Sequence, residues 1–200
     1  MNKKFRLFLT LFGLISVLTL QSCGDEEMLI PKPPSFLRTN LPEHEYTKMA
    51  LDEPYVYEIS KSYLVRPVLY KSEVTNHQEI NLGPLNGIMY LNYYTLPNHD
   101  TLVRYINLSN DKVDEHQIKA TKIERKRYVF PDKKVYGTFF ELQGDVATNY
   151  QFYLTDSVNH FIRGEVLMNC KPNYDSLRPS LDYLKKDLYH MIETFEWKNK

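Results

Sequence analysis

The stretch from residue 174 to residue 197 carries the pattern that most restricts the folds open to this chain. Its apolar residues recur at three- and four-residue spacing, the repeat of an α-helix, and form one stripe: Leu177, Leu181, Leu184, Leu188, Met191 or Ile192, and Phe195. Charged residues lie between them, with Asp182 and Lys186 spaced for an ion pair along the helix. We place Pro179 in the first turn, where a missing amide hydrogen costs little. Such a helix must bury its stripe, so the rest of the chain has to supply a second layer.

The region from residue 121 to residue 170 supplies a suitable partner. Four runs alternate apolar and polar residues, which is the period of a β-strand: 121–130, 135–144, 149–157 and 159–170. Short polar turns separate the runs, and Pro131 occupies the second position of a predicted type I turn. Strands joined by short turns pair antiparallel, so we predict an antiparallel meander.

Three further strands and a second helix are predicted upstream. Candidate strands span residues 56–60, 62–70 and 88–96, and Pro67 places the second of them at a sheet edge or a bulge because proline cannot donate to the ladder. Residues 98–100 cap a shorter helix that carries Leu102, Val103 and Ile106. The predicted fold class is α+β: an antiparallel β-sheet with a long C-terminal helix and a shorter helix packed on it.

The first residues predict export and a lipid anchor. A short cationic head precedes the apolar run 7–20, which is too short to span a bilayer permanently but suits a secretory signal. The run leads into Cys23, an arrangement that resembles a bacterial lipobox, in which the cysteine thiol is acylated and becomes the new N-terminus. The alternative is a thiol within a discarded signal. We predict a lipoprotein signal peptide at residues 1–22, a lipidated, acidic and proline-rich tether at 23–34, and a single globular α+β domain at 35–200.

The charge balance argues against a nucleic-acid partner. Removing Lys3, Lys4 and Arg6 with the signal leaves 22 of the 25 basic residues beside 25 acidic ones. A protein that displaces counterions from phosphates carries a basic excess, which this chain lacks.

The second cysteine, Cys170, has no partner within the chain once Cys23 is acylated. It alternates with Ile162, Val166 and Met168, so we place it on the apolar face of a strand as a small buried residue. The alternative, a reactive thiol, needs a cationic and partly open setting that a single neighbouring lysine hardly supplies.

No motif in the sequence points to catalysis, a metal or a cofactor. The glycines match neither the phosphate-binding loop nor the dinucleotide pattern, and no G-x-S-x-G elbow occurs. Asp187, His190 and Glu193 have the best spacing for a metal, but we place them on the solvent face of the C-terminal helix as a surface charge ladder. We therefore predict a protein that is not an enzyme and needs no cofactor.

One turn brings together the residue types of a catalytic triad, namely Asp156, Ser157 and His160. Known triads gather their members from distant segments, whereas neighbours in one turn rarely aim correctly. We interpret these residues as a hydrogen-bonded turn network.

Two surfaces are candidates for binding. The basic run 122–127 is typical of a charged edge strand that blocks aggregation, and a docking patch is the alternative. Tyr90, Phe152 and Tyr153 could line a groove for a peptide or a glycan, although one face of an aromatic strand is normally core. We expect Trp197, the single tryptophan, to close the edge of the core rather than to bind a ligand.

Three long stretches resemble one known family: PKPPSFLRTNLPEHEY (31–46), FYLTDSVNHFIRGEVLMN (152–169) and NYDSLRPSLDYLKKDLYHMIETFEW (173–197). They are similar to the gliding motility lipoprotein GldD family of Bacteroidota. The resemblance implies a non-enzymatic accessory of the gliding motility and type IX secretion machinery, with other proteins of that apparatus as partners. It also implies a Mog1/PsbP-like body. The alternative function is an envelope lipoprotein that binds a peptide or glycan through an aromatic-rich sheet.

The residues after Cys23 bear on location. Asp25, Glu26 and Glu27 resemble the signal that sends lipoproteins of Bacteroidota to the outer membrane and cell surface, and a soluble spacer is the alternative. We predict a cell-envelope protein, lipid-anchored to a membrane, with the outer membrane or cell surface favoured over the inner membrane.

The chain departs from the family at one predicted bridge. The resemblance implies a cysteine before Pro54 and another further along, but Glu53 precedes Pro54 and residues 81–92 contain no cysteine. We predict no disulfide.

Overall fold

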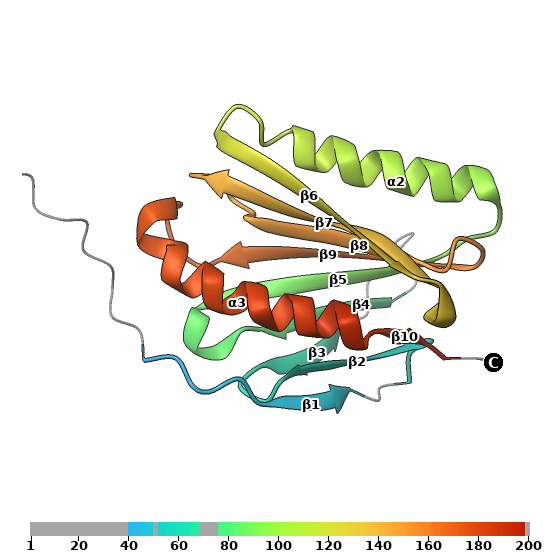
Figure 1. Ribbon diagram of the computed structural model, residues 1–200, viewed down its shortest axis with the longest axis horizontal. Helices are drawn as coiled ribbons and strands as arrows, with labels where there is room; N and C mark the ends of the chain where they lie inside the picture. Colours follow the sequence, from blue (N-terminus) through green and yellow to red (C-terminus); the bar gives the residue numbers. More distant parts are fainter. Residues whose placement is uncertain (1–39, 50–51, 69–75, 199–200) are drawn as a thin grey trace, which may run out of the picture. The chain divides into compact units, whose positions relative to one another are not determined.

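Most predicted elements are present in the computed structural model, which describes residues 40–49, 52–68 and 76–198 (Figure 1). Its strands are β1 (Tyr46–Met49), β2 (Tyr55–Ser60), β3 (Leu64–Val68), β4 (Asn76–Asn81), β5 (Gly87–Thr95), β6 (Ala120–Phe130), β7 (Val135–Gly144), β8 (Tyr150–Thr155), β9 (His160–Met168) and β10 (Glu196–Trp197). The helices are α2 (His99–Asp114) and α3 (Tyr174–Thr194), with short 3₁₀ helices η2 (Gly83–Leu85) and η3 (Pro131–Lys133). Neither of the described α-helices is long and apolar enough to cross a membrane.

The main sheet of the described chain has seven antiparallel strands in the order β3-β4-β5-β9-β8-β7-β6. Strands β6 to β9 pair consecutively, which confirms the predicted meander. Strand β5 pairs with β9 from Gly87 opposite Met168 to Thr95 opposite His160, and this pairing joins the upstream strands to the meander. Strand β3, which contains Pro67, forms one edge as predicted.

A second, smaller sheet was not predicted. Strand β2 lies at its centre, with β1 on one side and β10 on the other, and Trp197 stands opposite Tyr55. The outer strands have four and two residues, too few for a clear alternating pattern. Strands from near the two ends of the described chain, β1 and β10, therefore pair with the same strand, β2.

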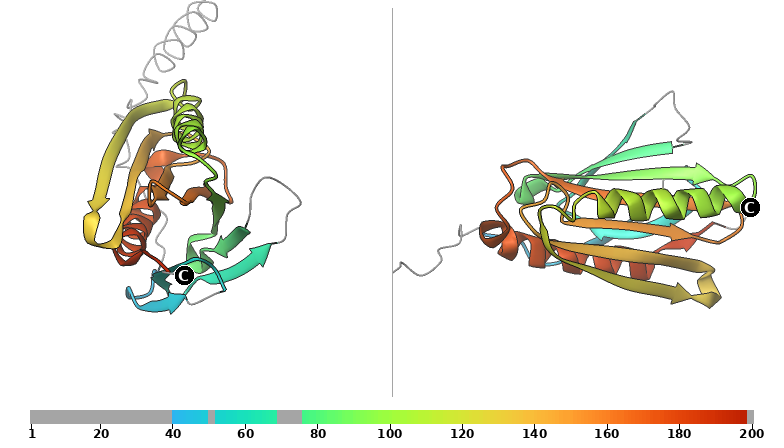
Figure 2. Two further views of the ribbon diagram at one scale, coloured as in Figure 1. Left: turned by 90° about the vertical axis from the view of Figure 1, so that its right-hand side faces the viewer. Right: turned by 90° about the horizontal axis from the view of Figure 1, so that it is seen from above.

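Helix α3 provides the apolar layer that the sequence pattern requires. Its buried face, which includes Leu184, Leu188 and Ile192, packs with the inner face of the main sheet and with β2 in one core cluster. The prediction for Pro179 was wrong: Asn173 caps the helix through its side chain, so the helix starts at Tyr174 and Pro179 lies inside it. Figure 2 shows α3 and α2 on opposite faces of the main sheet.

Helix α2 starts where the sequence predicts it. The side chain of Asn98 accepts a hydrogen bond from the Thr101 backbone N–H at 2.9 Å, which is a standard N-cap. Leu102 and Tyr105 pack with Phe161 on the outer face of the sheet. The α+β fold class is confirmed by this arrangement.

The prediction for Cys170 was wrong. Strand β9 ends at Met168, and the alternation that would bury the next residues ends with it. The Cys170 backbone N–H donates to the Met168 carbonyl at 2.8 Å, which bends the chain, and the side chain is exposed.

Candidate functional site

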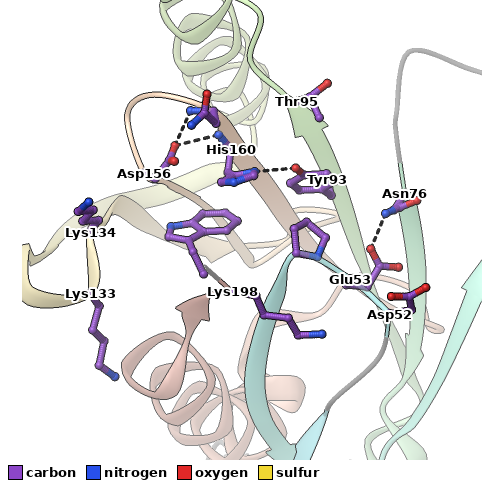
Figure 3. A pocket seen from close by; sticks show the side chains of 13 residues that line it. Asp52, Glu53, Asn76, Tyr93, Thr95, Lys133, Lys134, Asp156, His160 and Lys198 are labelled. Atoms are coloured by element: carbon purple, nitrogen blue, oxygen red, sulfur yellow. Dashed lines mark hydrogen bonds between the residues drawn. The ribbon is translucent and has the colours of Figure 1, made fainter. Parts of the chain in front are cut away.

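An open pocket of about 800 Å³ lies where the ends of several strands meet (Figure 3). Its lining residues come from segments far apart in the sequence: Asp52, Glu53, Pro54, Asn76, Tyr93, Thr95, Lys133, Lys134, Asp156, Asn159, His160, Trp197 and Lys198. We call it the charged pocket. Its size falls within the range of about 300–1,000 Å³ that is usual for small-ligand sites.

Three aromatic rings form the floor of the charged pocket. The Tyr93 hydroxyl lies 2.7 Å from His160 Nδ1, and burial raises the pKa of Tyr93 to about 12, so the phenol stays protonated as a hydrogen-bond partner. The His160 ring stacks on Trp197 at a centroid distance of 5.1 Å. The Trp197 ring also meets the Phe195 ring edge-on at a centroid distance of 4.8 Å. Trp197 therefore closes the edge of the core, as predicted, and it also lines the pocket.

The turn between β8 and β9 holds His160 in place. Asp156 Oδ1 accepts hydrogen bonds from the backbone N–H groups of Val158, Asn159 and His160 at 2.8–2.9 Å. Ser157 does not line the pocket, and the ring nitrogen of His160 pairs with Tyr93 instead. The predicted turn network is therefore confirmed, and these residues do not form a triad.

Acidic and amide groups form one wall of the charged pocket. Asn76 donates a short hydrogen bond to Glu53, and Asp52 lies beside them. Burial raises the pKa of the Glu53 carboxyl and the neighbouring Asp52 adds to the effect, while the hydrogen bond from Asn76 and the charge of Lys198 oppose it. The sequence offered no signal for this wall, because β4 has only two buried residues among polar ones.

Lysines form the opposite wall. Lys133 and Lys134 come from η3 and its end, and Figure 3 shows them across the pocket from Asp52 and Glu53. Lys133 Nζ donates to the Glu193 carbonyl at 2.9 Å, whereas Lys134 is exposed and has no ion pair with another described residue. Asp52 and Lys134 thus place opposite charges on the two sides of the pocket, while Lys198 lies toward Glu53 on the acidic side.

A second polar group, the Asp187 cluster, lies on α3 and corrects the prediction of a surface charge ladder. Asp187 is only 3% exposed. Its Oδ1 lies 2.7 Å from His44 Nδ1 and 3.0 Å from the Tyr46 hydroxyl, and its Oδ2 accepts from the Tyr63 hydroxyl at 2.5 Å. Segments near the N-terminal side of the domain supply these donors, and the helical pattern of α3 alone could not reveal them.

The three residues considered for a metal do not converge. His190 Nε2 pairs with Glu58 at 2.7 Å and its ring stacks on Tyr46, while Asp187 is bound by other donors. No group of three histidine, cysteine or acidic side chains that could hold a metal occurs within residues 40–49, 52–68 and 76–198.

The basic run 122–127 lies on β6, the other edge of the main sheet, as predicted for an edge strand. Lys122 pairs with Glu124, Arg125 pairs with Asp114 at 2.8 Å, and Lys126 lies 4.0 Å from the centre of the Tyr189 ring. These charges have partners within the domain, which weakens the alternative of a docking patch.

The aromatic residues proposed for a groove divide between two faces. Phe152 belongs to the inner core, and Tyr153 packs against Phe161 on the outer face. Tyr90 stacks near His77 on the outer face of β4 and β5. None of the three lines the charged pocket, to which β5 contributes Tyr93 and Thr95.

The described residues thus define a small α+β domain with a charged, aromatic-floored surface pocket. The chain belongs to the gliding motility lipoprotein GldD family, whose model matches residues 26–197. It is accordingly a gliding motility lipoprotein, a membrane-anchored protein of the cell envelope. The predicted lipidation site, Cys23, and the tether lie outside the described residues and stay predictions.

Two other comparisons add little. None of the curated proteins compared with the chain matches it. The solution structure of PsbP (CyanoP) from Synechocystis sp. PCC 6803 is similar at 10% identity and a TM-score of 0.44, covering 82% of this chain and 99% of that one. A TM-score this low decides nothing beyond the α+β class already evident.

Proposed function

We propose that this gliding motility lipoprotein is a non-enzymatic accessory of the gliding machinery and of type IX secretion, and that it works through contacts with other proteins of that apparatus. The family match over residues 26–197 carries the proposal. The geometry of the charged pocket supports it, since the pocket offers charge and aromatic surface for recognition.

The hydrogen bonds of the described residues favour a binding role over catalysis. Nucleophilic catalysis needs a hydroxyl or thiol within reach of a base. In the charged pocket His160 pairs with the phenol of Tyr93, but burial raises the pKa of that phenol and so disfavours the phenolate, and Asp156 accepts from three backbone amides. The exposed Cys170 is not among the lining residues.

The proposal includes a lipid anchor at Cys23 and favours the outer membrane or cell surface. Two or three acyl chains hold a protein stably on a membrane, because each buried methylene contributes about 0.8 kcal/mol. Mass spectrometry of the mature protein should find residues 1–22 removed and Cys23 acylated. An unmodified cysteine or a retained leader would contradict the anchor.

Gene deletion tests the role in the cell. We expect loss of colony spreading and of secreted cargo, with both restored by the wild-type gene. Cys23→Ser should fail to restore them, while Cys170→Ser, a matched change at the other cysteine, should succeed. Normal spreading in the deletion strain would refute the motility role, and lost spreading with normal secretion would refute the secretion part alone.

The second candidate function is binding of a peptide or a glycan. The observation that favours it is the pocket itself, where the half-buried rings of His160 and Trp197 stack at its floor above the buried Tyr93.

A further inference from the structure

We infer that the charged pocket binds an extended peptide segment that carries an acidic group at one end and a basic group at the other. The inference rests on the proposed function, because it names the site through which the lipoprotein contacts another protein. It commits to a polypeptide ligand, and three features of the described residues support this choice.

The first feature is the separation of charge. Asp52 and Lys134 stand on opposite sides of the pocket, and neither has an ion pair with another described residue (Figure 3). Lys198 acts on Glu53 at the acidic side, and Lys133 at the basic side pairs with Glu196 at 3.5 Å. Asp52 and Lys134 are therefore the wall charges left for a ligand. A ligand with two opposite charges satisfies both walls at once.

The second feature is a pair of backbone groups without partners in the described chain on Trp197, a residue that lines the pocket. The Lys198 backbone N–H donates to the Pro54 carbonyl at 2.8 Å, and Trp197 stands opposite Tyr55. In an antiparallel ladder the hydrogen-bonding direction alternates along the strand, so the N–H and C=O of Trp197 point away from β2. Strand β10 is an edge of its sheet, and no hydrogen bond among the described residues engages these two groups. An extended peptide can pair with such an edge.

The third feature is the aromatic floor between the charged walls. His160 and Trp197, which are half-buried and lie above the buried Tyr93, present ring surface on which the side chains of an extended peptide can pack. A glycan could also stack there. A neutral glycan, however, gains nothing from ionic contact with either wall, and an acidic glycan meets Asp52 and Glu53. The charges therefore favour a peptide.

The test uses four synthetic octapeptides with the same alternating Val and Ser centre. Their ends carry one Asp and one Lys, two Asp, two Lys, or two Ser. Binding to the full chain in detergent is followed by the fluorescence of Trp197, which is the single tryptophan of the chain and lines the pocket. Labelled peptides and fluorescence polarisation provide a second readout.

We expect the wild-type chain to prefer the peptide with one Asp and one Lys by about two- to fivefold per charged end, as for partly exposed ion pairs. Asp52→Lys should shift the preference to the peptide with two Asp, and Lys134→Glu to the peptide with two Lys. Asp111→Lys and Lys119→Glu are matched exposed controls outside the pocket and should leave the order unchanged. A change of preference cannot arise from misfolding alone.

Three results would overturn the inference: the same order of peptides in every variant, no peptide binding at millimolar concentration, or a neutral oligosaccharide that quenches Trp197 while the peptides do not. A failure of the peptide-binding inference can be distinguished from a failure of the proposed function. A deletion strain that loses spreading, yet is fully restored by the double variant Asp52→Lys/Lys134→Glu, refutes the peptide site alone. Peptide binding that follows the charges, together with normal spreading of the deletion strain, refutes the proposed function alone.

Discussion

The charged pocket and the Asp187 cluster contain the same kinds of side chain, and differ in how far these side chains are paired with one another. Around Asp187, three donors from the same chain approach both carboxylate oxygens, and the group is almost fully buried. In the charged pocket, Asp52 and Lys134 face solvent on opposite sides. Paired, buried groups hold a fold together, whereas separated, open charges remain available to a ligand. Mutations in the two regions should therefore differ in size and kind.

The largest effect should come from Asp187→Ala. The change leaves His44, Tyr46 and Tyr63 without their shared acceptor, so we expect a loss of about 3 kcal/mol in the free energy of unfolding. Urea denaturation of the full chain measures it. Asp182→Ala, on the exposed side of the same helix, should cost less than about 0.5 kcal/mol. Equal costs for the two variants would remove the distinction between the regions.

A smaller loss should follow Tyr93→Phe. This change removes the hydroxyl that pairs with His160, and one such hydrogen bond contributes about 1 kcal/mol. Tyr128→Phe is the matched control, because the Tyr128 hydroxyl is buried and has no hydrogen-bond partner in the described structure. We expect the control to be neutral or slightly stabilising in the same urea experiment. A control that costs as much as Tyr93→Phe would contradict the assignment.

Glu53→Gln should change how stability depends on pH. Burial raises the pKa of Glu53 above its ordinary value of 4.5, so the folded chain holds this proton more tightly than the unfolded chain. The contribution of Glu53 to the free energy of unfolding is fully present below pH 4.5. It is lost as the pH rises through the pKa that Glu53 has in the folded chain. Because Gln does not titrate, the free energy of unfolding of the variant should rise relative to that of the wild type as the pH rises to 7. Parallel stability curves from pH 4 to pH 7 would show that Glu53 does not titrate in this way.

The smallest effect on stability should come from Asp52→Lys and Lys134→Glu. Both side chains are exposed and unpaired within the described chain, so each change should shift the free energy of unfolding by less than about 0.5 kcal/mol. Thermal and urea unfolding measure this directly. A loss of 2 kcal/mol or more would mean that the pocket walls are part of the structural core.

The sequence predicted those elements whose apolar period is long and regular. The stripe of α3 and the alternating runs of β7 to β9 bury their faces as expected, whereas the edge strand β6 buries only Tyr128. Strand β4 escaped prediction because a buried glutamine, Gln78, occupies a core position and pairs with the Tyr57 hydroxyl at 2.8 Å. Asp187 escaped because its burial depends on donors more than a hundred positions away.

The charged pocket shows the same limit more strongly. Sequence analysis singled out Asp156, His160 and Trp197 for local reasons, and the structure brings all three to the pocket. Their partners Asp52, Asn76 and Lys134 come from three other segments with no shared motif. The strand pairings bring these segments together: β4 with β5, β5 with β9, β7 with β8, and β2 with β10.

The position of β2 between β1 and β10 also makes the pocket depend on the last strand to be synthesised. Synthesis from the N-terminus produces β1 and β2 early, whereas the third strand of their sheet, Glu196 and Trp197, comes last among the described elements. Until then one edge of β2 has no neighbour, and the floor of the pocket lacks its tryptophan. The charged pocket is therefore completed only by the last strand of the described chain.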